Sequence, residues 1–503
     1  MSENVMARRG FVGQGSSSPG GGLGWAVSGG LGLGLMLVPL LVWLGWAEAT
    51  GFSNWIIPLG DPQVEGLVMV LSGTLMVAPF LWAVRSGRLD VAGLALAQNG
   101  LVMVGYFFLE ETAGRQGGIG YDTARYAGLL VMLNAVGFAV LLSVMTVVYV
   151  SAGRNGVGGL RLPSDERLIV LLRAVGLMCA VVLLLPMVQS RTIPLLAENA
   201  AVARYQMVES SWVRPLYHFG SALLPMTVAG LGVWIVRAPH RVLGWDGVCC
   251  LLMLGAQFLT SNRLPLALTL VATLALLSME MRWPRWLVGV VFLVYVGAFS
   301  FLSGLTSLLR QEGGIPQVHS VLQDSMAEAF KGDNLIDLRD GSWVLSQWDF
   351  ETWKGRTYWG GLVSFLPSGL FPLKKEWHLG QNALAVVGWE GEEHFGLRLT
   401  FFAESFLNFG LLGVVILGAV LGGCFGGLLA KIHDPPPGRE KSLARNLALV
   451  VTMQMLLPLA NTSDAFLSWA MGGLLVVMGL VVWWPAQRES GEKETRAGVG
   501  WPP

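Results

Sequence analysis

Glu404 and Asn408 lie four residues apart in the segment AESFLNFG, residues 403–410, where a long apolar run begins. On a helix this spacing places both side chains on one face. A carboxylate and an amide there can bind sugar hydroxyls or an arginine, and a carboxylate can act as a general base. A carboxylate in the first turn of a helix is also favoured by the helix dipole, so a structural role is an equal alternative.

Arginines form the second set of candidates. Arg191, Arg204 and Arg214 fall within residues 189–218, and Arg263 ends a short polar turn between two apolar runs. The guanidinium group is always charged and binds phosphate through two parallel hydrogen bonds. The four arginines together predict a clamp for a pyrophosphate. For any single arginine, contact with lipid headgroups is the alternative explanation.

The chain lacks the motifs of soluble nucleotide and zinc enzymes. It has no GxxxxGK[ST] loop for ATP and no HExxH sequence for zinc. The acidic run at residues 390–394, EGEEH, is better explained as a solvated turn than as a cation site. The four cysteines lie in apolar runs, as small buried hydrophobic residues do. We therefore predict no metal and no cofactor.

The composition excludes a soluble protein of this length. Of 503 residues, 53% are hydrophobic and 13% are charged, whereas ordinary globular chains have roughly 25% charged residues. The 66 glycines and 20 tryptophans fit helices that pack closely in lipid and aromatic anchors at its interface. Lys plus Arg and Asp plus Glu number 33 each, so nothing favours nucleic acid. The predicted fold class is an all-α polytopic membrane protein.

Apolar runs of the length needed to cross roughly 30 Å of hydrocarbon predict about 12 transmembrane helices. The seventh and eighth are separated only by residues 261–263, so a re-entrant pair is an alternative for them. The expected spans are 25–46, 66–84, 91–109, 127–150, 168–188, 219–236, 244–261, 264–280, 286–305, 406–430, 443–460 and 464–484.

Basic residues predict which ends of these helices face the cytoplasm. With the N-terminus inside, 19 of the 33 basic residues fall in cytoplasmic segments, and both termini are cytoplasmic. The expected organisation is a disordered leader (1–24), spans one to nine with an outside loop at 189–218 (25–305), a large periplasmic loop (306–400), spans ten to twelve (401–484) and a cytoplasmic tail (485–503).

The large loop is long enough to be functional or to carry structure of its own. It holds six of the 20 tryptophans. Stacking on sugar rings and anchoring at the membrane interface explain them equally well.

Four segments resemble the Wzy-type repeat-unit polymerases of O-antigen, capsule and exopolysaccharide. Residues 191–196 (RTIPLL), followed by Arg204, resemble the Arg-x-Ile-Pro-Leu opening of that family's periplasmic loop, and residues 261–263 (SNR) resemble its small-residue-plus-arginine turn. Thr357 and Tyr358, with residues 365–367 and 371–374, are similar to its aromatic loop, and residues 403–410 to its Gly-Glu-x-Tyr-Leu-Asn-Phe-Gly segment.

No single motif is specific, and their order over roughly residues 185 to 430 carries the resemblance. The chain also departs from the family pattern at three positions. Ser368 stands where the family often has arginine, Leu373 where aspartate is common and Ala403 where glycine is usual. The first departure argues against a phosphate contact at residue 368.

The resemblance implies a multi-span, GT-C-like glycosyltransferase architecture in the bacterial inner membrane. It implies inverting transfer at the periplasmic face, without a cofactor. The donor is a growing glycan on undecaprenyl pyrophosphate, and the acceptor is the non-reducing end of another lipid-linked repeat unit. A flippase and a chain-length regulator are the implied protein partners.

On this interpretation Glu404 is the expected catalytic carboxylate. Arg191 and Arg263 are expected to stabilise the charge that develops on the leaving pyrophosphate. The expected substrate-binding residues are Arg204, Arg214, Lys374, Asn408, Tyr358 and His218.

Three alternatives remain. An O-antigen ligase shares the topology and donor and uses a loop histidine, for which His319, His378 and His394 are available. A transporter or flippase of lipid-linked sugars predicts internal repeats, and we find no convincing one. A metal-dependent multi-span glycosyltransferase needs closely paired acidic residues in the first outside loop, and the acidic residues there are widely spaced.

Overall fold

The computed structural model describes residues 122–154, 164–197, 200–209, 214–260, 263–281, 338–363, 371–374, 376–388, 399–433 and 442–456, with a few isolated positions. Helices make up 87% of this part, which contains no strand. The spans expected at 25–46, 66–84, 91–109, 286–305 and 464–484 lie outside it, apart from isolated positions.

The long helices of the described part coincide with the other expected spans. They are α5 (Asp122–Arg154), α6 (Asp165–Ser190), α8 (Arg214–Arg237), α9 (Trp245–Leu259), α10 (Arg263–Met281), α16 (Phe401–His433) and α17 (Leu443–Leu456). Of these, α6, Gly220–Arg237 of α8 and Phe401–Ile432 of α16 are long and apolar enough to cross a membrane. Shorter apolar helices occur in α5, α9, α10 and α17. The described part is therefore that of an all-α membrane protein.

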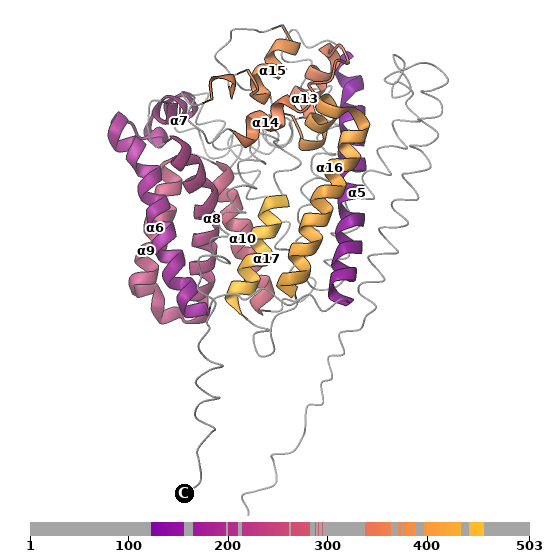
Figure 1. Ribbon diagram of the computed structural model, residues 1–503. Coiled ribbons are helices and arrows are strands. Elements are labelled where there is room, and N and C mark those ends of the chain that lie inside the picture. The colour runs from indigo at the N-terminus through magenta and orange to yellow at the C-terminus, as the bar shows by residue number, and fades with distance from the viewer. Residues whose placement is uncertain are drawn as a thin grey trace, which may run out of the picture.

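Short helices connect the long ones. They are η3 (Pro194–Leu196), α7 (Ala200–Glu209), η4 (Pro239–Leu243), α13 (Leu338–Gln347), α14 (Arg356–Leu362), η5 (Pro372–Lys374) and α15 (Leu379–Val386). Figure 1 shows α7 and α13 to α15 gathered at one end of the long helices. The large loop thus carries structure of its own, in agreement with the expectation from its length.

Glycines set the contact between α5 and α16. A Cβ atom on Gly418 would lie 2.8 Å from the carbonyl oxygen of Gly137, and one on Gly426 would lie 2.5 Å from that of Met145. Gly418 thus faces Gly137, and Gly426, further along α16, faces Met145, further along α5. The two helices therefore run parallel. The predicted topology gives these two spans the same direction. Small residues let the backbones approach this closely, which is the main source of helix association in lipid.

A polar network joins four helices at the end opposite α7 and α14. Arg237 of α8 forms a two-pronged ion pair with Glu280 of α10, and it also contacts Asp165 of α6 at 2.7 Å. Asp165 in turn accepts a hydrogen bond from the backbone N–H of Leu443, where α17 begins. Asn446 donates to Glu280 at 2.8 Å. All four helix ends are ones that the charge pattern assigns to the cytoplasm.

The helices α9 and α10 are separate helices rather than a shallow pair. Asp246, in the first turn of α9, forms an ion pair with Arg173 of α6, whereas the other end of α9 lies near Tyr217, where α8 begins. The far end of α10 contributes Glu280 to the network with Arg237, where α8 ends. Each helix therefore runs along α8, which disfavours the re-entrant alternative.

The tryptophans of the large loop have mixed roles. Trp348 is buried, and Trp343 and Trp353 pack against the core. Trp377 contacts Phe371, whereas Trp359 is 60% exposed. Packing within the loop thus explains most of them, and only Trp359 among these five remains available to a sugar or to the membrane interface.

Labelling of single cysteines in intact cells tests the orientation. We expect Glu351→Cys, in a chain with the four native cysteines replaced, to react with an impermeant maleimide from outside, because Glu351 is exposed beside α14. Leu243→Cys in η4 is the matched control. Leu243 is 95% exposed, and it should react only after the membrane is opened. Labelling of the two sites from the same side would contradict the topology.

Adjacent glycines test the contact between α5 and α16. Gly426→Ala should lower the melting temperature in detergent, because the new methyl group overlaps the Met145 carbonyl and overpacking costs about 1–3 kcal/mol. A Cβ on Gly427 meets nothing within 4 Å, so Gly427→Ala should be neutral or slightly stabilising. Equal effects of the two substitutions would show that the helices do not pack through these glycines.

Candidate functional site

The helix α16 is broken close to its start. It begins at Phe401, where the hydroxyl of Thr400 accepts a hydrogen bond from the N–H of Ala403, an N-cap interaction. Gly410 has φ 69° and ψ −164°, a conformation that favours glycine. A Cβ on Gly413 would lie 2.8 Å from the carbonyl oxygen of Ser405, although eight residues of straight helix span about 12 Å. Residues 401–409 therefore fold back against the helix that follows.

The break leaves carbonyl groups that the large loop satisfies. Backbone N–H groups of Trp353 and Lys354 donate to the carbonyl oxygens of Leu407 and Asn408, at 2.9 Å and 3.1 Å. A carbonyl group buried without a partner would cost free energy. These two hydrogen bonds hold the start of α14 against residues 401–409.

Glu404, Thr357 and Asn408 form a buried chain of hydrogen bonds. The hydroxyl of Thr357 donates to Oε1 of Glu404 at 2.5 Å, and Nδ2 of Asn408 donates to the Thr357 hydroxyl at 2.7 Å. Each of the three residues is 1% exposed. The spacing that predicted one helical face for Glu404 and Asn408 is confirmed, since Nδ2 of Asn408 also donates to the carbonyl oxygen of Glu404. The result is a carboxylate held in one orientation.

Tyr358 lies beside this chain. Its hydroxyl is 2.6 Å from Oγ of Ser405, and both hydroxyl groups are within hydrogen-bond distance of the carbonyl oxygen of Phe401. Burial raises the pKa of Tyr358 well above its usual 10, and the Glu404 carboxylate raises it further, against a smaller effect of the Ser405 hydrogen bond. The phenol therefore stays protonated at physiological pH and acts as a hydrogen-bond donor.

Aromatic rings surround the polar groups. Phe409 stacks on Tyr358 with ring centroids 6.0 Å apart, and Phe401 meets the same tyrosine edge to face. Trp348 packs against Phe406 at 5.5 Å. Phe409 is 46% exposed, so the cluster lies next to the surface of the protein.

Arg191 ends α6 at the same end of the molecule. It adopts the left-handed conformation, φ 54°, and its side chain is exposed. The next N–H, of Thr192, donates to the carbonyl oxygen of Met187. Arginine is disfavoured in this conformation relative to glycine. The backbone at Arg191 thus ends α6, and the exposed guanidinium can meet an anion.

Arg204 lies within electrostatic range of Tyr217, which is near Thr260 where α9 ends. Burial raises the pKa of Tyr217, whereas the charge of Arg204 and the Thr260 hydrogen bond lower it. The two arginine-bearing segments, residues 191–196 and α7, are therefore both part of the group of helices α6 to α10.

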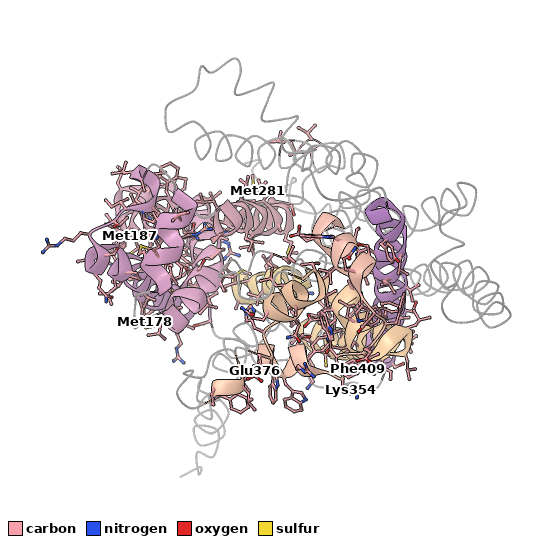
Figure 2. All side chains as sticks on the ribbon, turned by 90° about the horizontal axis from the view of Figure 1, so that it is seen from above. Met178, Met187, Met281, Lys354, Glu376 and Phe409 are labelled. Atoms are coloured by element: carbon pink, nitrogen blue, oxygen red, sulfur yellow. The ribbon has the colours of Figure 1, made fainter. Side chains whose placement is uncertain are left out.

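The structure brings together some of the expected site residues. Glu404, Asn408 and Tyr358 meet in one cluster. In Figure 2, Phe409 and Lys354 lie together beside it, whereas Met187, one turn before Arg191, lies in the other group of helices. The side chains of Arg214, His218, Arg263 and Lys374 lie outside the described part. Glu404 and Arg191 therefore lie on helices of different groups, α16 and the end of α6.

Three residues in or next to the cluster, Thr357, Lys354 and Arg356, were not predicted as site residues from the sequence. In the sequence Thr357 stands out only as part of a motif, although it bridges Glu404 and Asn408. Lys354 and Arg356 flank Gly355 at the start of α14, and both side chains are exposed. Their proximity in the chain to Thr357 was the signal that could have found them.

Two other expectations concern metals and histidines. In the described residues, no group of three or more His, Cys, Asp and Glu side chains could hold a metal ion. His378 is the N-cap of α15, where its Nδ1 accepts from the N–H of Gly380 at 3.2 Å. His319 and His394 lie outside the described residues.

Comparison with known proteins finds no matching family model, no similar curated protein and no similar solved structure.

A pair of glycines tests the docking of the loop. Gly355 and Gly388 have φ 81° and 76°, so alanine at either position adds backbone strain of about 1–2 kcal/mol. Only at Gly355 would the new methyl group also meet the ring of Phe409, at 2.8 Å. Gly355→Ala should therefore lower the melting temperature more than Gly388→Ala and expose the loop to proteolysis. Equal protease resistance of both variants would contradict the docking.

Proposed function

We propose that the protein is a repeat-unit polymerase that joins undecaprenyl-pyrophosphate-linked oligosaccharides at the periplasmic face of the inner membrane. One observation carries the proposal. Two of the segments that resemble this family, at Thr357–Tyr358 and at residues 403–410, contact each other side chain to side chain. They are about 50 residues apart in the chain, and their contact surrounds a buried carboxylate.

The reaction that suits this cluster is glycosyl transfer to a hydroxyl group. The acceptor hydroxyl gives its proton to the Glu404 carboxylate, and its oxygen forms a bond to the anomeric carbon of the donor sugar. The bond from that carbon to the pyrophosphate oxygen breaks, and its electron pair leaves with the pyrophosphate. A positioned general base contributes about 10²–10⁴-fold to such a step. Energy comes from the sugar–pyrophosphate bond, so no ATP is needed.

Cations must lie close to the leaving pyrophosphate, because the new charge develops there. Lys354 and Arg356 lie on the segment that carries Thr357, whereas Met187, one turn before Arg191, lies in the other group of helices (Figure 2). We therefore assign the leaving pyrophosphate to Lys354 and Arg356. The acceptor carries a lipid pyrophosphate of its own, one repeat unit from the reacting hydroxyl, and Arg191 and Arg204 suit that second anion.

Chain elongation in cells tests the proposal. Glu404→Gln should reduce elongation at least about 100-fold, because the amide cannot take the proton. Single repeat units should then accumulate on the lipid. The readouts are the gel ladder of polymer lengths and the mass of the lipid-linked glycans. Glu376→Gln removes an exposed carboxylate of the same loop and should leave the ladder unchanged.

Two results would reject the proposal. A normal ladder from Glu404→Gln would remove the carboxylate from the reaction. Long chains that remain on the lipid would identify a ligase instead, since a ligase acts after polymerisation.

A further inference from the structure

The amide of Asn408 has an orientation that its neighbours fix. Its Nδ2 donates one hydrogen to Thr357 and the other to the carbonyl oxygen of Glu404, at 2.7 Å and 2.9 Å. If the amide nitrogen and oxygen were exchanged, Oδ1 would face the backbone carbonyl oxygen of Glu404. Both atoms are acceptors, so that orientation is excluded. The amide oxygen Oδ1 therefore points away from both neighbours.

That oxygen has no hydrogen-bond partner, although the residue is only 1% exposed. A buried acceptor without a donor costs about 1–3 kcal/mol. Unsatisfied polar atoms of this kind are rare in folded proteins, and each requires an explanation such as strain, a catalytic role or a bound water or ion. Beside a buried carboxylate and next to the surface, a bound group that supplies the donor is the explanation we pursue.

The direction of the hydrogen bonds fixes the kind of group. Thr357 accepts from Asn408, so its single proton must go to Glu404. Glu404 is thus an acceptor at Oε1, and Asn408 offers a further acceptor at Oδ1. The cluster takes a hydrogen-bond donor, such as a hydroxyl group, and it disfavours phosphate, whose oxygens are acceptors.

We propose that Asn408 Oδ1 holds the hydroxyl of the acceptor sugar against Glu404, and that Thr357 is the positioning residue that fixes both side chains. This inference rests on the proposed function and assigns the cluster to the acceptor rather than to the donor pyrophosphate. The half-exposed ring of Phe409, the residue after Asn408, offers an apolar face for the sugar next to this hydroxyl site.

Transfer between two separately varied substrates tests the assignment. The donor is the lipid-linked repeat unit extracted from a strain that lacks this protein. The acceptor is the free oligosaccharide released from the same lipid by mild acid. The full-length protein in proteoliposomes receives both, and mass spectrometry measures the extended oligosaccharide. Because the lipid-linked repeat unit is itself an acceptor, its KM as a donor is measured at saturating oligosaccharide, and the KM of the oligosaccharide is measured at a fixed donor concentration.

Asn408→Leu should raise the KM for the oligosaccharide about 10-fold, the effect of losing one hydrogen bond to an uncharged group, and leave the KM for the lipid-linked donor unchanged. Asn408→Ala provides the same comparison if the leucine variant does not fold. Thr357→Val should lower kcat, and Thr357→Ser should restore it, because serine keeps the hydroxyl. If Thr357 served only to fill space, valine would be tolerated better than serine, because its shape is closer to that of threonine.

The possible outcomes distinguish failure of the inference on Asn408 from failure of the proposed function. A raised donor KM with an unchanged oligosaccharide KM would place the pyrophosphate in the cluster and overturn the inference. If the KM values for donor and oligosaccharide both stay unchanged and only the melting temperature falls, the inference is also overturned. Failure of the wild-type protein to extend either the oligosaccharide or the lipid-linked repeat unit itself would instead reject the proposed function.

Discussion

The carbonyl groups released at Gly410 are the constraint on which the candidate site depends. Within a membrane protein every buried backbone group must find a partner, and a helix break exposes several at once. The N–H groups of Trp353 and Lys354 provide two of those partners. To do so, the chain adopts positive φ at Lys354 and Gly355. The docked loop then brings Thr357 to Glu404, so a break in one helix assembles a site from segments 47 residues apart.

Features that repeat along one helix could be predicted from the sequence. The apolar runs located α5, α6, α8, α9, α10, α16 and α17, because the length of a span is set by the thickness of the hydrocarbon. The four-residue spacing predicted the shared face of Glu404 and Asn408 for the same local reason. The glycine content indicated closely packed helices, and Gly418 and Gly426 of α16 indeed meet α5.

Features that depend on distant parts of the chain could not be predicted. No local pattern reveals that Thr357 would bond with Glu404, since that contact follows from the fold of the large loop. In the sequence Gly410 is one of 66 glycines, and nothing local marks it as the position of a helix break. The arginines also appeared as one set because they share a type and a side of the membrane. The structure instead places α6, which ends at Arg191, apart from α16, which carries Glu404 (Figure 1).

A substrate with two chemically different ends suits this separation. A lipid-linked repeat unit carries a hydroxyl at one end and a pyrophosphate at the other, and one group of helices offers buried acceptors while the other offers arginines. The central claim is that Thr357 acts through Glu404. Its most direct test is the rate of glycan transfer at saturating acceptor, where the effect of Asn408 on KM does not enter, by a double variant, Thr357→Val with Glu404→Gln, compared with each single variant. We predict that the double variant is no slower than Glu404→Gln alone. A rate reduced by the product of the two single effects would contradict the account.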